Sequence, residues 1–301
     1  MTDTDRRGLL AAGLLTSALM SAASAKAAAK PSEGQMIELW PNGAPGGSKV
    51  TVAEKATEVV DKGQTGRDIS GITRPRFSLH RPKTKTDTAM LVIAGGAFNR
   101  VVFDKEGEEV CRWLADNGIA AGALLYRLPG DGWEAGQDAP VQDAQRALRL
   151  LVQATGAKRV GIMGFSAGGT IAAALATRST EALYPPVDAA DKLDATPGFM
   201  CLGYAYMNVP KAPRENMFKG LTKATPPTFF FHAADDQRVP MANSIEPFQE
   251  LRAFGVPAAL HVFESGAHGF GLRAPEGSSA ARWPDLFLTW ARAGGHLGAS
   301  L

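Results

Sequence analysis

The chain has 301 residues, of which 45% are hydrophobic, 21% charged and 8% aromatic. This is the composition of an ordinary globular protein with a sizeable core, and it excludes a chain that is mainly disordered. Lys and Arg number 32 against 30 Asp and Glu, so the net charge of +2 gives no broad positive field for nucleic acid or an anionic membrane. We therefore expect a small or neutral partner.

The first 25 residues have the pattern of a secretory signal peptide. A polar start contains Arg6 and Arg7, an uncharged stretch covers 8–24, and Ala23-Ser24-Ala25 fits a small-residue cleavage site. The paired arginines indicate the twin-arginine type of bacterial export signal. A short N-terminal membrane anchor and a disordered Ala-rich tail are the alternatives.

Cleavage after residue 25 would leave a flexible lead-in over 26–35 and a single domain over 36–301. No later segment has the roughly 20 unbroken apolar residues that span a bilayer. We expect the exported protein to have no membrane contact and to be periplasmic or secreted.

Strands and helices are predicted to alternate along the rest of the chain. Apolar runs typical of strands, the first two of them edge strands, occur at 36–40, 76–80, 89–94, 119–126, 159–163, 199–206, 228–232 and 258–264. Apolar residues at helical spacing predict helices from Asp104 to Asn117, from Asp138 to Gly156, and at 167–176, 243–254 and 283–293. This alternation predicts an α/β fold with a mostly parallel central sheet and helices on both faces.

Two cysteines, Cys111 and Cys201, are too few for a disulfide framework or for a site of four thiolates. Both lie in apolar surroundings, which favours buried free thiols. A bridge between them is the alternative, because sequence does not give the geometry that a bridge requires.

The motif Gly-x-Ser-x-Gly at 164–168 joins a predicted strand to a predicted helix. This context is typical of a nucleophile elbow, in which small residues allow a sharp turn that exposes the hydroxyl of Ser166. The alternative is a glycine-rich turn with an idle serine.

A serine hydroxyl needs an imidazole to take its proton and a carboxylate to orient that imidazole. Of the five histidines, only His268 lies in a glycine-flanked loop just after a strand, where a side chain can reach a cleft. Asp235 and Asp236 both follow the strand at 228–232, between Ser166 and His268. Spacing does not choose between these two carboxylates, although repulsion makes only one of them suited to a desolvated site.

The oxyanion formed during acyl transfer needs fixed hydrogen-bond donors. Ala167, the residue after Ser166, is one candidate, and Gly96 and Ala97 follow the strand at 89–94 where the others are expected. The alternative is that these glycines only make a tight turn. No His-Glu-x-x-His or comparable spacing is present, so we expect no metal and no cofactor.

From Trp40 onward the chain resembles the bacterial acetylxylan esterase-like α/β-hydrolases, also described as xylanase or feruloyl esterase domain-like. The resemblance rests on Leu39-Trp40-Pro41, Gly95-Gly96, Tyr126-Arg127-Leu128-Pro129, Asp143-Ala144-Gln145-Arg146-Ala147, the glycine-rich stretch 164–169, the stretch 187–191, Asp236 with Val239-Pro240, and His268-Gly269-Phe270-Gly271. It implies Ser166 as nucleophile, His268 as general base and acid, and Asp236 as the orienting carboxylate.

The resemblance implies a serine carboxylesterase that removes acetyl groups from carbohydrate esters such as acetylated xylan or xylo-oligosaccharides. Two departures from the family pattern concern Ala97, where a third glycine is usual, and Thr170, where a histidine often stands. Ala97 keeps its amide but has less freedom at positive φ. A peptidase or a lipase of the same fold, and a non-catalytic carbohydrate-binding homologue, are the competing hypotheses.

Overall fold

The computed structural model describes residues 34–207 and 217–298 of the chain. The predicted signal peptide, 1–25, and most of the predicted lead-in lie outside these residues. None of the helices in the described residues combines the length and the hydropathy that a membrane span requires.

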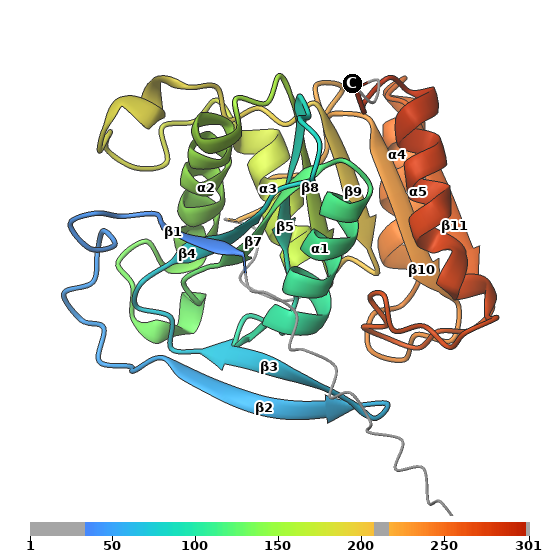
Figure 1. Cartoon of the computed structure of the whole chain (residues 1–301), viewed down its shortest axis with the longest axis horizontal. Helices are drawn as coiled ribbons and strands as arrows, with labels where there is room; N and C mark the ends of the chain where they lie inside the picture. The colour runs from blue at the N-terminus through green and yellow to red at the C-terminus, as the bar shows by residue number, and fades with distance from the viewer. Residues whose placement is uncertain (1–33, 208–216, 299–301) are drawn as a thin grey trace, which may run out of the picture. The chain divides into compact units, whose positions relative to one another are not determined.

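A central sheet organises the fold. Within the described ranges it contains eight strands in the order β1-β4-β7-β5-β8-β9-β10-β11 (Figure 1). These are β1 (Gln35–Glu38), β4 (Arg76–His80), β5 (Thr88–Ile93), β7 (Ala120–Leu125), β8 (Arg159–Phe165), β9 (Phe199–Gly203), β10 (Thr228–Ala233) and β11 (Ala258–Phe263). Neighbours from β7 to β11 are parallel, whereas β4 is antiparallel to both β1 and β7. The predicted, mostly parallel α/β sheet is therefore confirmed.

Helices pack on both faces of this sheet. They are α1 (Glu109–Asp116), α2 (Ala139–Thr155), α3 (Ala167–Arg178), α4 (Ala242–Ala253) and α5 (Trp283–Ala293). On β10, the Phe231 ring stacks on Trp283 of α5, whereas the next side chain, His232, hydrogen bonds Ser244 of α4. Because successive side chains of a strand point to opposite faces, α4 and α5 cover opposite sides of β10. Trp113 of α1 contacts Trp283, so α1 packs beside α5.

The apolar runs gave the strand positions well because every residue of β5, β7 and β10 is buried. The largest difference is at β9, which ends at Gly203 and not at Tyr206 as predicted. Tyr204 adopts a φ of +36°, which takes the chain out of the extended conformation. The amide of Tyr206 then donates to the carbonyl oxygen of Ser166, so the chain turns toward the end of β8.

A second sheet, which the sequence analysis does not predict, has three strands among the described residues. They are β2 (Lys55–Asp61), β3 (Gln64–Ser70) and β6 (Val101–Val102). Most side chains of β2 are exposed, so no apolar periodicity marks the strand. Lys62 and Gly63, both with positive φ, form the tight turn of the β2-β3 hairpin, seen at the bottom of Figure 1. The amide of Val102 in β6 donates to the carbonyl of Gly95, which brings this sheet to the end of β5.

Cys111 lies in α1 and Cys201 in β9, and both are buried free thiols, as predicted. Burial raises the pKa of both thiols well above its usual value. The two groups therefore behave as small apolar side chains of the core.

Candidate active site

Ser166 lies at the sharp turn between β8 and α3. Its φ of +50° falls in the left-handed region, which costs a non-glycine residue conformational energy. The flanking glycines are required on steric grounds. A Cβ atom at Gly164 would lie 2.5 Å from the carbonyl oxygen of Gly168, and one at Gly168 would lie 2.1 Å from that of Ile93. The turn presents Ser166 at the carboxyl end of β8, as the motif predicts.

The structure brings Ser166, His268 and Asp236 together in one chain of hydrogen bonds. The Oγ atom of Ser166 lies 2.9 Å from Nε2 of His268, and Nδ1 of His268 lies 2.7 Å from Oδ2 of Asp236. An ionised carboxylate only accepts hydrogen bonds, so the proton of the neutral imidazole is on Nδ1. Nε2 is then free to accept the hydroxyl proton of Ser166.

Asp236 is buried in a turn that donates several hydrogen bonds to it. Its Oδ1 accepts from the amides of Arg238 and Val239, each at 2.9 Å. Burial acts to raise the pKa of Asp236, but the hydrogen bonds from His232, His268 and the Val239 amide outweigh it and hold the pKa well below its usual range. The side chain is therefore a carboxylate at neutral pH.

His232 lies within the predicted strand 228–232 and is a supporting residue that the sequence does not mark as functional. Its ring is fully buried, and Nε2 lies 2.9 Å from the carbonyl oxygen of Val239 and 3.3 Å from Oδ2 of Asp236. Nδ1 lies 2.8 Å from the hydroxyl of Ser244. A carbonyl can only accept, so Nε2 carries the proton and His232 holds the turn around Asp236 in place.

The loop after β5 carries the predicted oxyanion residues Gly96 and Ala97. Gly96 has a φ of +132°, and a Cβ atom there would lie 2.1 Å from the carbonyl oxygen of Arg100, so only glycine fits. Ala97 has a φ of +55°, which shows that the alanine adopts the left-handed conformation that a glycine would adopt at lower cost. Among the described residues, no acceptor is bound by the amides of Gly96, Ala97 and Ala167.

A cavity of about 290 Å³ opens over Ser166 and His268. Gly96, Ala97 and Ala167 all line it. The rest of its described lining is small or polar and consists of Arg100, Val102, Lys105, Glu106, Tyr206, Arg238, Val239 and Gly269. The nucleophile-like serine, the imidazole and the residues that carry the unpaired amides therefore line one common space.

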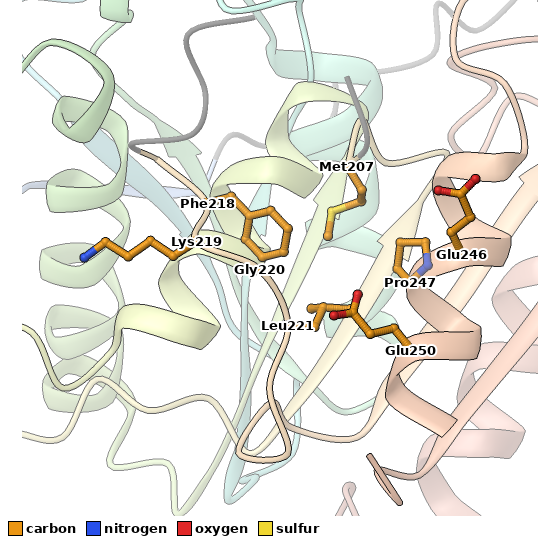
Figure 2. A pocket seen from close by; sticks show the side chains of 8 residues that line it. All are labelled: Met207, Phe218, Lys219, Gly220, Leu221, Glu246, Pro247 and Glu250. Atoms are coloured by element: carbon orange, nitrogen blue, oxygen red, sulfur yellow. The ribbon is translucent and has the colours of Figure 1, made fainter. Parts of the chain in front are cut away.

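A second cavity of about 440 Å³ lies against α4 (Figure 2). Met207, Phe218 and Leu221 give it apolar walls, and Glu246 and Glu250 of α4 stand at its side. It shares no lining residue with the cavity over Ser166, and its described lining contains no serine, cysteine or histidine. We therefore place the candidate chemistry in the cavity over Ser166.

The sequence profile of the prolyl oligopeptidase family matches residues 130–292. The matched segment contains Ser166, Asp236 and His268, whereas Gly96 and Ala97 precede it.

Two curated proteins are similar over about two thirds of the chain. An acetylxylan esterase of Xylanibacter ruminicola is 29% identical over 211 residues, which are 63% of this chain and 42% of that protein. The endo-1,4-beta-xylanase B of Butyrivibrio fibrisolvens is 26% identical over 215 residues, which are 64% of this chain and 33% of that protein. The matches thus span less than half the length of both relatives.

Solved structures resemble nearly the whole fold. The acetyl ester-xyloside bifunctional hydrolase of Caldicellulosiruptor lactoaceticus superposes with a TM-score of 0.67 at 26% identity, covering 88% of this chain and 98% of that one. A carboxylesterase of Lactobacillus plantarum has a TM-score of 0.62 at 20% identity, covering 82% of this chain and 99% of that one, and shares the fold. These similarities confirm the resemblance to acetylxylan esterase-like α/β-hydrolases that the motifs predict.

Proposed function

The chain belongs to the prolyl oligopeptidase family, and from that premise we propose that it is a serine carboxylesterase that removes short acyl groups, acetyl in particular, from carbohydrate esters. The observation that carries the proposal is the hydrogen-bonded chain from Ser166 through His268 to Asp236. These three side chains are the nucleophile, the general base and acid, and the orienting carboxylate of the proposed reaction.

In the acylation step, Oγ of Ser166 attacks the ester carbonyl carbon while Nε2 of His268 takes the hydroxyl proton. The buried carboxylate of Asp236 stabilises the imidazolium that forms. The C–O bond to the alcohol then breaks, the electron pair of that bond goes to the leaving oxygen, and His268 returns the proton to it. A water molecule activated by the same imidazole hydrolyses the acyl-serine and releases the carboxylic acid.

The negative charge on the carbonyl oxygen needs donors that are already in place. Gly96, Ala97 and Ala167 line the cavity and their amides have no acceptor among the described residues, so these amides are the donors in this proposal. The position of Ala167 at the first turn of α3 adds the favourable field of a helix N-terminus.

The character of the cavity supports a short acyl group on a polar alcohol. No Leu, Ile, Phe or Trp side chain is part of its described lining, as an extended apolar acyl chain would require. Arg100, Lys105, Tyr206 and Arg238 supply hydrogen-bond donors that suit sugar hydroxyl and ring oxygens. Two of the similar proteins are named for acetyl esters of xylan or xylosides, which makes acetylated xylo-oligosaccharides the substrate class to test.

A peptidase is the second candidate, and the family match is the observation that favours it. The same side chains would attack an amide carbonyl, with an amine as the leaving group. A dipeptidyl p-nitroanilide hydrolysed with a higher kcat/KM than any short p-nitrophenyl ester would reverse the order of the two candidates.

The direct test compares p-nitrophenyl esters from acetate to decanoate in the natural protein and in Ser166→Ala. We expect the highest kcat/KM for acetate, and a loss of about 10⁴-fold or more in the variant. Acetate release from acetylated xylo-oligosaccharides then tests the carbohydrate. Equal rates in the two proteins would remove Ser166 from the mechanism, and rates that rise with chain length would indicate a lipase.

We also propose that residues 1–25 direct export by the twin-arginine route, so that the enzyme acts outside the cytoplasm. The test is fractionation of bacterial cells that express the full chain and a variant with Arg6→Lys and Arg7→Lys. The variant should accumulate uncleaved in the cytoplasm. Equal export of both proteins would reject this route.

A further inference from the structure

A buried carboxylate lies beside the loop that carries Gly96 and Ala97 and lines the cavity over Ser166. Glu106 is 2% exposed and belongs to the π-helical turn Asp104–Glu108 that precedes α1. Within the described part of the chain it forms no ion pair with a basic side chain. Burying a carboxylate without a cation is costly, and π-helical turns are frequent at functional sites, so the role of this side chain needs an explanation.

Two hydrogen bonds hold the Glu106 carboxylate. Its Oε2 accepts from the amide of Gly95 at 2.8 Å, and its Oε1 accepts from the hydroxyl of Tyr204 at 2.9 Å. Burial, together with the charge of Glu106, raises the pKa of Tyr204 well above its usual value. The hydroxyl therefore keeps its proton and acts as the donor to Glu106.

Tyr204 also contacts the loop that carries His268. Its hydroxyl oxygen accepts a hydrogen bond of 3.0 Å from the amide of Gly271, three residues after His268. Its ring contacts the His268 imidazole edge to face, with the ring centroids 5.1 Å apart. Tyr204 is fully buried and has a φ of +36°, so the chain is strained at the residue that makes these contacts.

The four groups form one path between the two loops that flank Ser166. The path begins at Gly95, which directly precedes Gly96 and Ala97, passes through Glu106 and Tyr204, and ends at Gly271. Gly95 itself lies against the nucleophile, since a Cβ atom there would be 2.8 Å from Cβ of Ser166.

We propose that Glu106 and Tyr204 are positioning residues that fix the oxyanion loop and the His268 loop relative to each other. This inference rests on the esterase function proposed above. The pair acts through the Gly95 amide on one side and through the Gly271 amide and the His268 ring on the other. Errors of about 1 Å in such geometry lower rates by up to about 100-fold, so the pair acts on kcat and leaves ground-state binding largely intact.

Two conservative variants interrupt the path at different points. Tyr204→Phe keeps the ring against His268 but removes the hydroxyl, which leaves Glu106 Oε1 and the Gly271 amide without their partner. Glu106→Gln keeps the shape of the side chain but replaces one of the two acceptor oxygens with an NH2 donor, so either the Gly95 amide or the Tyr204 hydroxyl loses the acceptor of its proton. Each variant therefore breaks at least one of the two links.

The chain offers a matched control in Tyr184→Phe. Tyr184 is also buried, and its hydroxyl also donates to a carboxylate, Asp191, at 2.6 Å. It does not line the cavity over Ser166. Removing the Tyr184 hydroxyl therefore shows how much kcat and Tm change when a buried tyrosine–carboxylate hydrogen bond is lost away from the site.

The experiment measures kcat and KM for p-nitrophenyl acetate, the rate of fluorophosphonate labelling of Ser166, and Tm for the natural protein, the three single variants and the Glu106→Gln, Tyr204→Phe double variant. We expect kcat and the labelling rate to fall about 10- to 100-fold in Tyr204→Phe and Glu106→Gln, with KM changed less than about threefold. Tyr184→Phe should leave kcat unchanged. Because both residues act in one path, the double variant should lose far less than the product of the two single losses.

Full kcat and labelling in both single variants, or losses in the double variant equal to the product of the single losses, would overturn the inference. A loss of kcat in Tyr184→Phe as large as in Tyr204→Phe would also overturn it, because the effect would then be one of general stability. Failure of the proposed function is distinguishable, since the natural protein itself would then neither hydrolyse the ester nor react with the fluorophosphonate.

Discussion

Asp235 and Asp236 are neighbours in sequence, yet they hold different parts of the same loop. Asp236 accepts from Nδ1 of His268 at 2.7 Å. Asp235 is exposed and accepts from the amides of Gly266 and Ala267, at 3.0 and 2.8 Å. One carboxylate therefore contacts the imidazole, while the other fixes the backbone on which that imidazole is carried.

This division of roles predicts different kinetics for two otherwise identical substitutions. Asp236→Asn should lower kcat for p-nitrophenyl acetate by about 10³- to 10⁴-fold, because an amide can donate to Nδ1 and favour the wrong imidazole tautomer. Asp235→Asn keeps an oxygen for the loop amides and should lower kcat by less than about tenfold. Similar losses in the two variants would contradict the assignment of Asp236 as the orienting carboxylate.

The low pKa of Asp236 predicts how stability depends on pH. The pKa in the folded protein lies below the ordinary value of 3.8, so the folded state binds fewer protons than the unfolded state as the pH falls. The resulting stabilisation is complete above the ordinary carboxyl range and is lost as the pH falls from there toward the folded-state pKa. The Tm advantage of the natural protein over Asp236→Asn should thus shrink as the pH falls below about pH 4. Thermal scans at acidic pH test it, and an advantage that grows as the pH falls below about pH 4 would contradict the sign.

The glycine at position 168 should not tolerate even a methyl group. A Cβ atom there would lie 2.1 Å from the carbonyl oxygen of Ile93, in backbone that cannot move without disturbing β5. Gly168→Ala should lower the free energy of unfolding by about 3 kcal/mol or more, measured by urea denaturation. Gly130→Ala is the control, since nothing lies within 4 Å of its added Cβ, and it should change stability by less than about 0.5 kcal/mol.

Ala97 should accept glycine but not a branched side chain. At a φ of +55°, glycine relieves the steric cost of the left-handed conformation while keeping the amide that the proposed oxyanion hole uses. Ala97→Gly should retain kcat within about threefold, whereas Ala97→Val should lower it by about 100-fold, because a β-branched residue is an outlier at positive φ. If Ala97→Val kept full activity, the amide at this position would not be a required donor.

The sequence by itself determined the features that depend on neighbouring residues. The elbow at Ser166 is set by local sterics, in which each glycine makes room for backbone a few residues away or for the adjacent strand. The strands β5, β7 and β10 are buried along their whole length, so their apolar runs predicted them directly. Order along the chain also restricted the partners of Ser166 to His268 and to one of two adjacent aspartates.

Spacing left both aspartates open and the family resemblance favoured Asp236, but only the tertiary structure places Asp236 against His268 and reveals the groups that surround the pair. The alternation of side chains along a strand gives no information about the turn after β10, where Asp236 is buried and its neighbour Asp235 is exposed. The hairpin of β2 and β3 was not predicted, because the side chains of β2 are mostly exposed and give no apolar pattern, and because its partner strand β6 is far along the chain. Tyr204 and Glu106 are 98 residues apart, and a hydrogen bond over such a separation leaves no local pattern in sequence, because its geometry comes from the packing of β9 and the turn before α1.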